Sequence, residues 1–230
     1  MAFWRRKQRD PIETCADALY ASLKSAVAQG GRIRVEELVS AAAAIVGEAA
    51  IAKAGDYDPR QHVYTPGTRI FSTKINTLLC DDKSLREAPP ESMLGDLRDR
   101  LHRCGFAESD FPKLEDVFTY FAQSIGKKDE WGRVPLSIAQ QHYPFAQPLR
   151  IAYESRAIID TSFAPLGDDA GKRLRAATAV LARALCETRD AMARNIAITL
   201  AIETINGMAK TAPMTDAAVA RIREAGKTKA

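Results

Sequence analysis

Two polar segments of the sequence contain the residue types that bind ligands or transfer protons. One runs from residue 56 to residue 74, and the other runs from residue 131 to residue 160. Both interrupt stretches of helical periodicity, and functional side chains gather in such connecting segments. If the two segments meet in the folded chain, their side chains together would form one binding site.

The first segment offers both oxygen ligands and cations. Asp56 and Asp58 carry carboxylates that suit a hard metal ion. A helix is expected to begin at Thr68, and its free backbone N–H groups, with Arg69 and Lys74 nearby, would bind an anion. Aspartate and proline also favour turns, and threonine is a common helix N-cap. A turn followed by a capped helix is therefore the simpler interpretation.

The second segment places aromatic rings beside arginines. Trp131 and Tyr143 would form the walls of a pocket for a planar ligand, and Arg150 and Arg156 would bind its anionic group. The simpler interpretation is a long loop that its aromatic rings hold against the core. Because both interpretations use the same residues, only the folded arrangement distinguishes them.

Two pairs of opposite charges in the second segment have the spacing of helical ion pairs. Arg150 precedes Glu154 by four residues, and Arg156 precedes Asp160 by the same interval. Each such pair stabilises a helix by only about 0.2–0.5 kcal/mol. These residues are thus expected to pair on a helix even if they bind no ligand.

Few residues are available for acid–base or metal chemistry. The candidates for proton transfer are His62, His142 and Glu154, and the candidate metal ligands are Asp56, Asp58 and Asp160. The sequence has no glycine-rich nucleotide loop, no HExxH motif, no nucleophile elbow and no EF-hand loop. No cofactor is indicated. The sequence favours a protein that is not an enzyme, without deciding the question.

The positive net charge belongs to the two ends of the chain. Four basic residues lie between positions 5 and 9, and the last ten residues carry a net +3, so the total of +4 leaves the body at −3. A whole-domain basic face for nucleic acid is therefore not indicated. The basic N-terminal tail, which also contains Phe3 and Trp4, is a candidate for contact with an anionic surface.

Cysteine usage and hydropathy predict a soluble, cytoplasmic protein. The four cysteines are widely spaced without a CxxC pair, so we expect them to be buried and reduced. No apolar leader follows the basic start. The longest apolar stretch, residues 196–202, is far shorter than the roughly 18 residues of a membrane span, so no transmembrane segment is expected.

Helical periodicity dominates the elements that must position these residues. Apolar residues recur at intervals of three and four, and no segment shows sustained strand alternation. The sequence therefore predicts an all-α, single-domain bundle of about eight helices. We expect a basic tail at 1–10, a helical domain at 11–212, and a short terminal helix with a second basic tail at 213–230.

One predicted helix is longer than the domain itself. Between Asp168 and Pro213 the helical pattern continues for about 40 residues, or about 60 Å, whereas a chain of this size folds to roughly 35–40 Å across. Either the helix kinks near Asn195, or one end projects. A projecting end would be buried most simply by a second copy of the chain, which predicts a homodimer.

Two functions of different class remain. The first is a non-enzymatic helical protein that acts through protein contacts, in an interaction or regulatory role, and self-associates through its long helix. The alternative is a protein, or an enzyme, that binds a small molecule or phosphate between segments 56–74 and 131–160. Convergence of these two segments would favour the alternative.

Overall fold

The chain folds into a helical bundle in the parts that the structure describes. The structure is a computed structural model, and it describes residues 9–55, 64–125 and 133–227. These residues contain α-helices and three short 3₁₀ turns but no named strand, so the all-α prediction is confirmed. The helices are α1 (Pro11–Val27), α2 (Val35–Ala54), α3 (Thr73–Cys80), α4 (Met93–Arg103), α5 (Leu114–Ser124), α6 (Pro148–Glu154), α7 (Arg156–Phe163), α8 (Ala170–Thr188), α9 (Arg194–Met208) and α10 (Asp216–Lys227).

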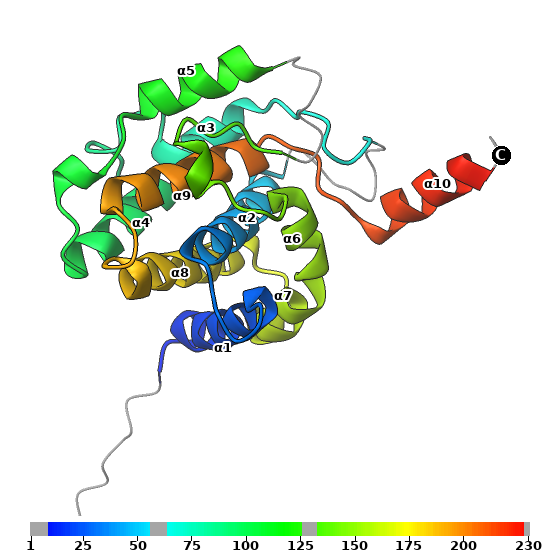
Figure 1. Cartoon of the computed structure of the whole chain (residues 1–230), viewed down its shortest axis with the longest axis horizontal. Coiled ribbons are helices and arrows are strands. Elements are labelled where there is room, and N and C mark those ends of the chain that lie inside the picture. The colour runs from blue at the N-terminus through cyan, green and yellow to red at the C-terminus, as the bar shows by residue number, and fades with distance from the viewer. Residues whose placement is uncertain (1–8, 56–63, 126–132, 228–230) are drawn as a thin grey trace, which may run out of the picture.

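The second helix is the centre of the bundle. α2 packs most extensively against α8 and α9, and it also contacts α1, α3 and α6 (Figure 1). Its alanine-rich middle, residues 41–44, is fully buried because small side chains let neighbouring helices approach closely. Gly47 makes the closest approach: a Cβ there would lie 2.5 Å from the Cβ of Met208 on α9.

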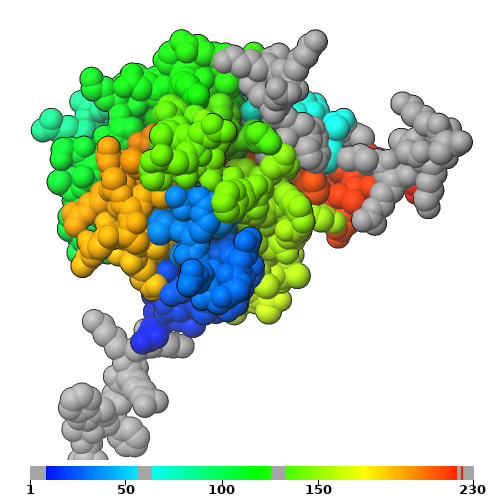
Figure 2. Space-filling model, in the orientation of Figure 1, coloured from blue at the N-terminus to red at the C-terminus, as the bar shows by residue number. Residues whose placement is uncertain are grey.

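The first helix begins as the sequence predicts. Asp10 is the N-cap, its side chain accepts a hydrogen bond from the backbone N–H of Ile12 at 2.9 Å, and Pro11 occupies the first turn. α1 then packs against α7 and α8, and Figure 2 shows α1 and α7 side by side on one face of the molecule.

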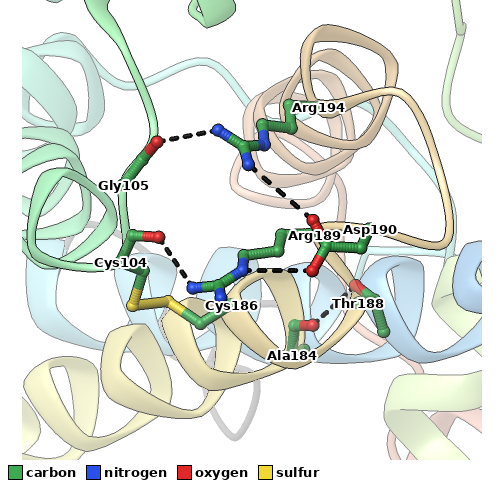
Figure 3. Close-up of a disulfide and its surroundings, with 8 residues drawn as sticks. All are labelled: Cys104, Gly105, Ala184, Cys186, Thr188, Arg189, Asp190 and Arg194. Carbon is green, nitrogen blue, oxygen red and sulfur yellow. Dashed lines mark hydrogen bonds and ion pairs between the residues drawn. A yellow bond between two sulfur atoms is a disulfide. The ribbon is translucent and has the colours of Figure 1, made fainter.

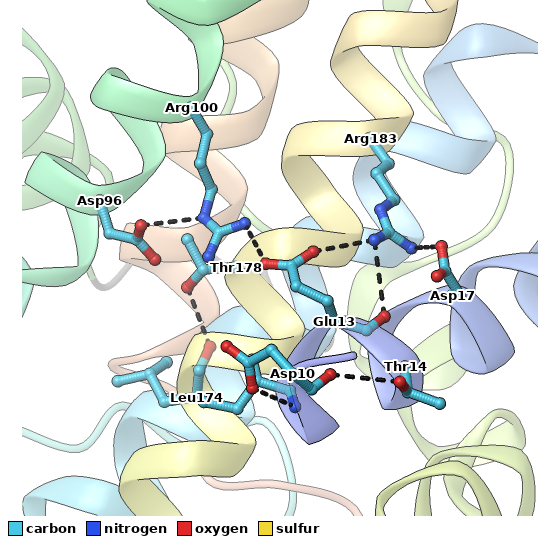
Figure 4. A network of polar contacts seen from close by, with 10 residues as sticks. Asp10, Glu13, Thr14, Asp17, Asp96, Arg100, Leu174, Thr178 and Arg183 are labelled. Carbon is cyan, nitrogen blue, oxygen red and sulfur yellow. Dashed lines mark hydrogen bonds and ion pairs between the residues drawn. The ribbon is translucent and has the colours of Figure 1, made fainter. Parts of the chain in front are cut away.

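A charged network fastens α1 to α4 and α8 (Figure 4). The Glu13 carboxylate accepts hydrogen bonds from Arg100 at 2.8 Å and from Arg183 at 2.9 Å, and Arg183 also pairs with Asp17. Burial by itself would raise the pKa of Glu13, but the hydrogen bonds and charges of the two arginines outweigh burial and lower it.

The prediction of one long helix is wrong. The structure instead shows two helices separated by a break. α8 starts one residue after its N-cap Asp169 and ends at Thr188, and α9 begins at Arg194. The longest helix is instead α2, with 20 residues. Tertiary contacts account for the break, because Arg189 donates to the Cys104 carbonyl at 3.0 Å and Arg194 donates to the Gly105 carbonyl at 2.8 Å (Figure 3). A straight helix would carry at least one of these arginines away from the end of α4.

The prediction that all four cysteines are reduced is also wrong. Cys104, at the end of α4, and Cys186, in the last turn of α8, form a disulfide with a Cα–Cα distance of 5.8 Å (Figure 3). Cys15 and Cys80 are buried free thiols, as expected. Disulfides are typical of oxidising compartments, so cysteine usage no longer supports the predicted cytoplasmic location.

Two further helix boundaries differ from those predicted. The helix expected from Thr68 begins only at Thr73, so Thr68 is not an N-cap and the anion site predicted at that helix start is not formed there. The helix expected from about 147 to 163 bends at Ser155, which ends α6 and precedes α7.

At the C-terminal end, the short terminal helix is present as α10, and it projects from the rest of the bundle (Figure 1). Within the described ranges, no helix combines the length and the hydropathy needed to cross a bilayer.

Candidate functional site

The two polar segments meet beside α5. The guanidinium of Arg69 donates to the main-chain carbonyl of Arg133 at 3.3 Å and to the hydroxyl of Thr211 at 2.6 Å. The same guanidinium lies 5.1 Å from the ring centroid of Phe121 on α5. The two segments, whose convergence the sequence leaves open, therefore meet at Arg69, but most other candidate residues of the two segments lie elsewhere.

Tyr143 and His142 lie in the loop that packs over the start of α2. The Tyr143 hydroxyl donates to the Leu136 carbonyl at 2.7 Å, and a ring nitrogen of His142 lies 3.4 Å from the Glu36 carboxylate. Tyr143 also lines a pocket of about 420 Å³ with Arg34, whose guanidinium stacks 3.8 Å from the exposed ring of Phe145. The side chains of this loop thus make most of their contacts with other residues of the protein.

A buried carboxylate anchors the same loop to the core. Glu203 on α9 is 3% exposed and accepts a hydrogen bond from the backbone N–H of Ser137 at 2.9 Å. Burial raises the pKa of Glu203, and the bond to Ser137 opposes the rise. This contact supports the interpretation of residues 133–147 as a loop held against the core.

Arg156 and Asp160 line a second cleft, of about 460 Å³, between α2, α7 and α8. Arg156 pairs with Glu48 of α2 at 3.3 Å rather than with Asp160, so the predicted helical pair between Arg156 and Asp160 is not formed. Asp160 instead lies 4.0 Å from Arg173. Burial raises the pKa of Glu48, against the attraction of Arg156. Both arginines of this cleft therefore already face a carboxylate of the protein.

The remaining candidates are exposed or lie outside the described residues. Arg150 and Glu154 form the predicted ion pair at 2.7 Å on the surface of α6, and Lys74 is exposed on α3. The candidates that fall outside the described residues are Asp56, Asp58, His62 and Trp131. In the ranges that are described, no three His, Cys, Asp or Glu side chains are grouped as metal ligands.

The site that the sequence did not indicate surrounds Lys210, just after α9. A pocket of about 360 Å³ opens over this side chain, and we call it the Lys210 pocket. Its lining residues come from the start of α3, the end of α5 and the segment after α9: Phe71, Ser72, Thr73, Asn76, Phe121, Ala122, Ile125 and Lys210. Figure 1 shows α5 lying over α3 and α9 at this edge of the bundle.

Backbone pairing holds Lys210 in place. Residues 67–70 run antiparallel to residues 210–212, with Ile70 N–H donating to the Lys210 carbonyl at 2.9 Å and Gly67 N–H donating to the Ala212 carbonyl at 2.9 Å. The return bond runs from Ala212 N–H to the Thr68 carbonyl at 2.7 Å. The segment that was predicted to start a helix therefore clamps the lysine from one side.

The Lys210 ammonium lies among aromatic rings rather than beside a carboxylate. Its Nζ is 4.7 Å from the ring centroid of Phe118 and 5.4 Å from that of Phe121, and it donates to Asn206 Oδ1 at 2.7 Å. No described carboxylate is ion-paired with it. Burial lowers the pKa of Lys210 to about 8, because the charged form loses hydration, and the nearby Cys80 opposes this change only in part.

Two buried amide atoms beside this lysine also lack partners. Asn76 Oδ1, an acceptor on a residue that lines the pocket, makes no hydrogen bond, and neither does Asn206 Nδ2. A buried polar atom without a partner costs about 1–3 kcal/mol. Of the two residues, only Asn76 lines the pocket, so its Oδ1 is the acceptor nearest to a bound molecule that carries a donor group.

Little in the sequence distinguishes Lys210 from the exposed lysines. The available signal is its position: it lies five residues after the end of the apolar stretch from Ile196 to Ile205, which predicts a helix buried on most sides. A lysine at the end of such a helix has to leave the core or lose its hydration.

Similarity to known proteins does not indicate a function. Comparisons with protein-family models, with curated proteins and with solved structures give no match for this chain. A function therefore has to be inferred from the arrangement of the described residues.

Proposed function

We propose that the protein binds a small organic anion in the Lys210 pocket, as a carboxylate attached to an apolar body. This is a specific form of the ligand-binding hypothesis that the polar segments suggest. The observation that carries it is a half-buried ammonium without a carboxylate partner among the described residues. A ligand carboxylate would supply the missing counter-charge at Nζ.

The other walls of the pocket fit the apolar part of such a ligand. Phe71 is 68% exposed and Ile125 is 42% exposed, and both line the pocket that Lys210 closes. Exposed apolar side chains that line a groove together are one mark of a ligand-binding site. At about 360 Å³ the pocket is at the small end of the usual range for ligand sites.

A carboxylate fits this site better than a phosphate. Lys210 presents one positive charge, whereas a phosphate dianion is bound best by paired arginine N–H groups or a helix N-terminus. Arg69 is the nearest guanidinium in the described part of the site, and it is already engaged with Thr211 and Arg133. Inorganic phosphate is thus expected to bind weakly.

Thermal melts with a series of phenyl-substituted carboxylates test the proposal. Phenylacetate and 3-phenylpropionate should raise the melting temperature by several degrees at 100 times their Kd, since this concentration adds about 2.7 kcal/mol. The matched uncharged amides and inorganic phosphate should give much smaller shifts. Equal shifts with carboxylate and amide would contradict a role for the ammonium.

Single substitutions test whether the Lys210 ammonium is the cation that binds the carboxylate. Lys210→Met should abolish the carboxylate shift, whereas Arg150→Ala, which removes an exposed charge on α6, should leave it unchanged. Affinity should also fall about tenfold per pH unit above the pKa of about 8, because only the protonated lysine binds the anion. A carboxylate shift that persists in folded Lys210→Met would overturn the proposal.

The interaction hypothesis has less support than the sequence suggested. Its argument for a homodimer was a helix of about 40 residues, and that helix is interrupted between Thr188 and Arg194. Self-association, a protein partner, contact of the basic tail with an anionic surface and a cytoplasmic location all stay predictions.

A further inference from the structure

The chemistry of Lys210 goes beyond the binding of an anion. An amine becomes a nucleophile when it loses its proton, and an apolar environment favours that loss. The Lys210 amine is half-buried beside Phe118 and Phe121, and its described neighbours include no carboxylate that would stabilise the charged form. It also lines a pocket large enough to admit a small molecule.

Three other described lysines are ion-paired, unlike Lys210. Lys24 is ion-paired with Glu187 at 2.8 Å, Lys83 with Asp81 at 3.1 Å, and Lys172 with Asp169 at 3.2 Å. Each of these ammonium groups has a carboxylate within hydrogen-bond reach. Lys210 differs from them both in its partners and in its burial.

We propose that the Lys210 amine captures small aldehydes with an apolar body as an imine within the Lys210 pocket. The inference rests on the proposed function in that both place a ligand over Lys210. The two ligands use different protonation states of one nitrogen, because the ammonium binds a carboxylate and the neutral amine attacks a carbonyl carbon. They therefore compete for the same site.

The covalent step requires only the aldehyde and releases water. The nitrogen lone pair forms a C–N bond to the carbonyl carbon as the C=O π electrons move to oxygen, and a proton passes from nitrogen to that oxygen through solvent. Loss of water from this carbinolamine, with the remaining N–H proton, gives the neutral imine, which takes up a proton to become the iminium. Formation of the imine consumes no oxidant or reductant and requires no metal.

The residues around the Lys210 amine can interact with each successive intermediate of imine formation. Asn76 lines the pocket and its buried Oδ1 has no partner, so a small rotation of the amide would let it accept a hydrogen bond from the hydroxyl of the carbinolamine. The iminium carries its positive charge at the former position of the ammonium, where the faces of Phe118 and Phe121 stabilise a cation. An aromatic aldehyde would place its ring against Phe71 and Ile125.

Reductive trapping tests the inference on the unmodified full chain. The protein is treated briefly with limiting benzaldehyde and sodium cyanoborohydride, which reduces the imine to a stable benzylamine, and the labelled lysines are identified by peptide mass spectrometry. Lys172 is the internal reference, because its exposed ammonium is paired with Asp169.

The expected selectivity follows from the fraction of neutral amine. At pH 7 an amine of pKa about 8 is about 200 times more deprotonated than an ordinary lysine, and its lower basicity makes it a weaker nucleophile. We therefore expect Lys210 to be labelled about ten times faster than Lys172. The ratio of the Lys210 labelling rate to the Lys172 labelling rate should decrease as the pH rises from 8 to 10, because Lys210 then has few protons left to lose.

The outcomes separate the inference from the proposed function. Selective labelling of Lys210 that 3-phenylpropionate suppresses would support both. If carboxylates bind but Lys210 is labelled no faster than Lys172, the imine inference fails and the proposed function stands. If Lys210 is labelled selectively and no carboxylate binds or competes, the proposed function fails and the inference stands. Equal labelling in a protein that binds no carboxylate would overturn both.

Discussion

Lys210 and Lys24 show how strongly one residue type depends on its surroundings. Lys24 lies on the surface of α1 with Glu187 at 2.8 Å, whereas Lys210 is half-buried beside two phenylalanine rings of α5, with an amide as its hydrogen-bond partner. The first arrangement stabilises positive charge and the second weakens it. The difference has a consequence for folding as well as for chemistry.

Replacing Lys210 should change how stability depends on pH. Between pH 8 and 10 the unfolded chain keeps a proton that folded Lys210, with its pKa of about 8, has released, so rising pH favours the folded state. Below pH 8 the burial of the charge destabilises the fold. Lys210→Met should therefore be more stable than the natural chain at pH 7, by on the order of 2–3 kcal/mol, and this advantage should shrink towards pH 10.

Urea denaturation at several pH values measures this difference directly. Lys172→Met serves as the control for the removal of an exposed lysine. If Lys210→Met and the natural chain differed in stability by the same amount at every pH from 7 to 10, this result would contradict the burial of a charged Lys210.

Sequence spacing predicts surface pairs better than buried ones. Arg150 and Glu154 pair on α6 as their spacing predicts, whereas Arg156, with the same spacing to Asp160, pairs with Glu48. The reason is that Glu48 is largely removed from water on α2 and has the greater need of a counter-charge. Long-range partners of this kind, including the aromatic rings around Lys210, have no local signature.

At the scale of elements, periodicity predicts most helices but not their interruptions. The residues from 189 to 193 contain neither glycine nor proline, so nothing local breaks the pattern there. The break depends on Arg189, Arg194 and the disulfide, which all attach this region to the end of α4. Similarly, residues 67–70 pair with residues 210–212, a contact between distant segments, instead of forming the predicted helical turn.

The contact of α2 with α9 predicts an unusual response to a helix-favouring substitution. Gly47→Ala gains about 1 kcal/mol of helix propensity, but the new Cβ would lie 2.5 Å from Met208 Cβ and 2.9 Å from the Ala209 nitrogen. Overpacking of this kind costs about 1–3 kcal/mol or more. We expect a net loss of stability, and, because Ala209 adjoins Lys210, weaker carboxylate binding as well.

A second glycine on a helix provides the matched control. A Cβ on Gly171, in the first turn of α8, would approach only the side chains of Asp169 and Lys53, at 3.3 Å or more. Gly171→Ala should therefore change the free energy of unfolding by less than about 1 kcal/mol. If Gly47→Ala melts no lower than Gly171→Ala, the close approach of α2 and α9 is not as tight as described.

At the scale of the whole molecule, the terminal helix is separable from the bundle. α10 projects from the body, and its described attachment includes the hydrogen bond from the Tyr153 hydroxyl to Asp216 at 2.7 Å (Figure 1). The pairing of residues 67–70 with residues 210–212, by contrast, is part of the fold. The boundary predicted at residue 212 stays a prediction.

Shortening the chain should reveal this boundary. A chain of residues 1–215 should melt within about 2 °C of the full chain and should still bind carboxylates, because α10 contributes little buried surface. A chain of residues 1–209 should melt lower and lose binding, since it lacks both Lys210 and the paired backbone. Circular dichroism melts compare the three chains, and equal losses in both shortened chains would show that α10 belongs to the core.

The disulfide gives the molecule a covalent connectivity that differs from its linear order. Cys104 and Cys186 are 82 positions apart, so the chain between them is a closed ring that carries α5 with Phe118 and Phe121. Lys210 lies outside this ring. A protease that cuts one peptide bond inside the ring therefore releases no fragment: both pieces migrate as one band until a reductant is added, and the aromatic wall of the pocket stays tethered to its amine.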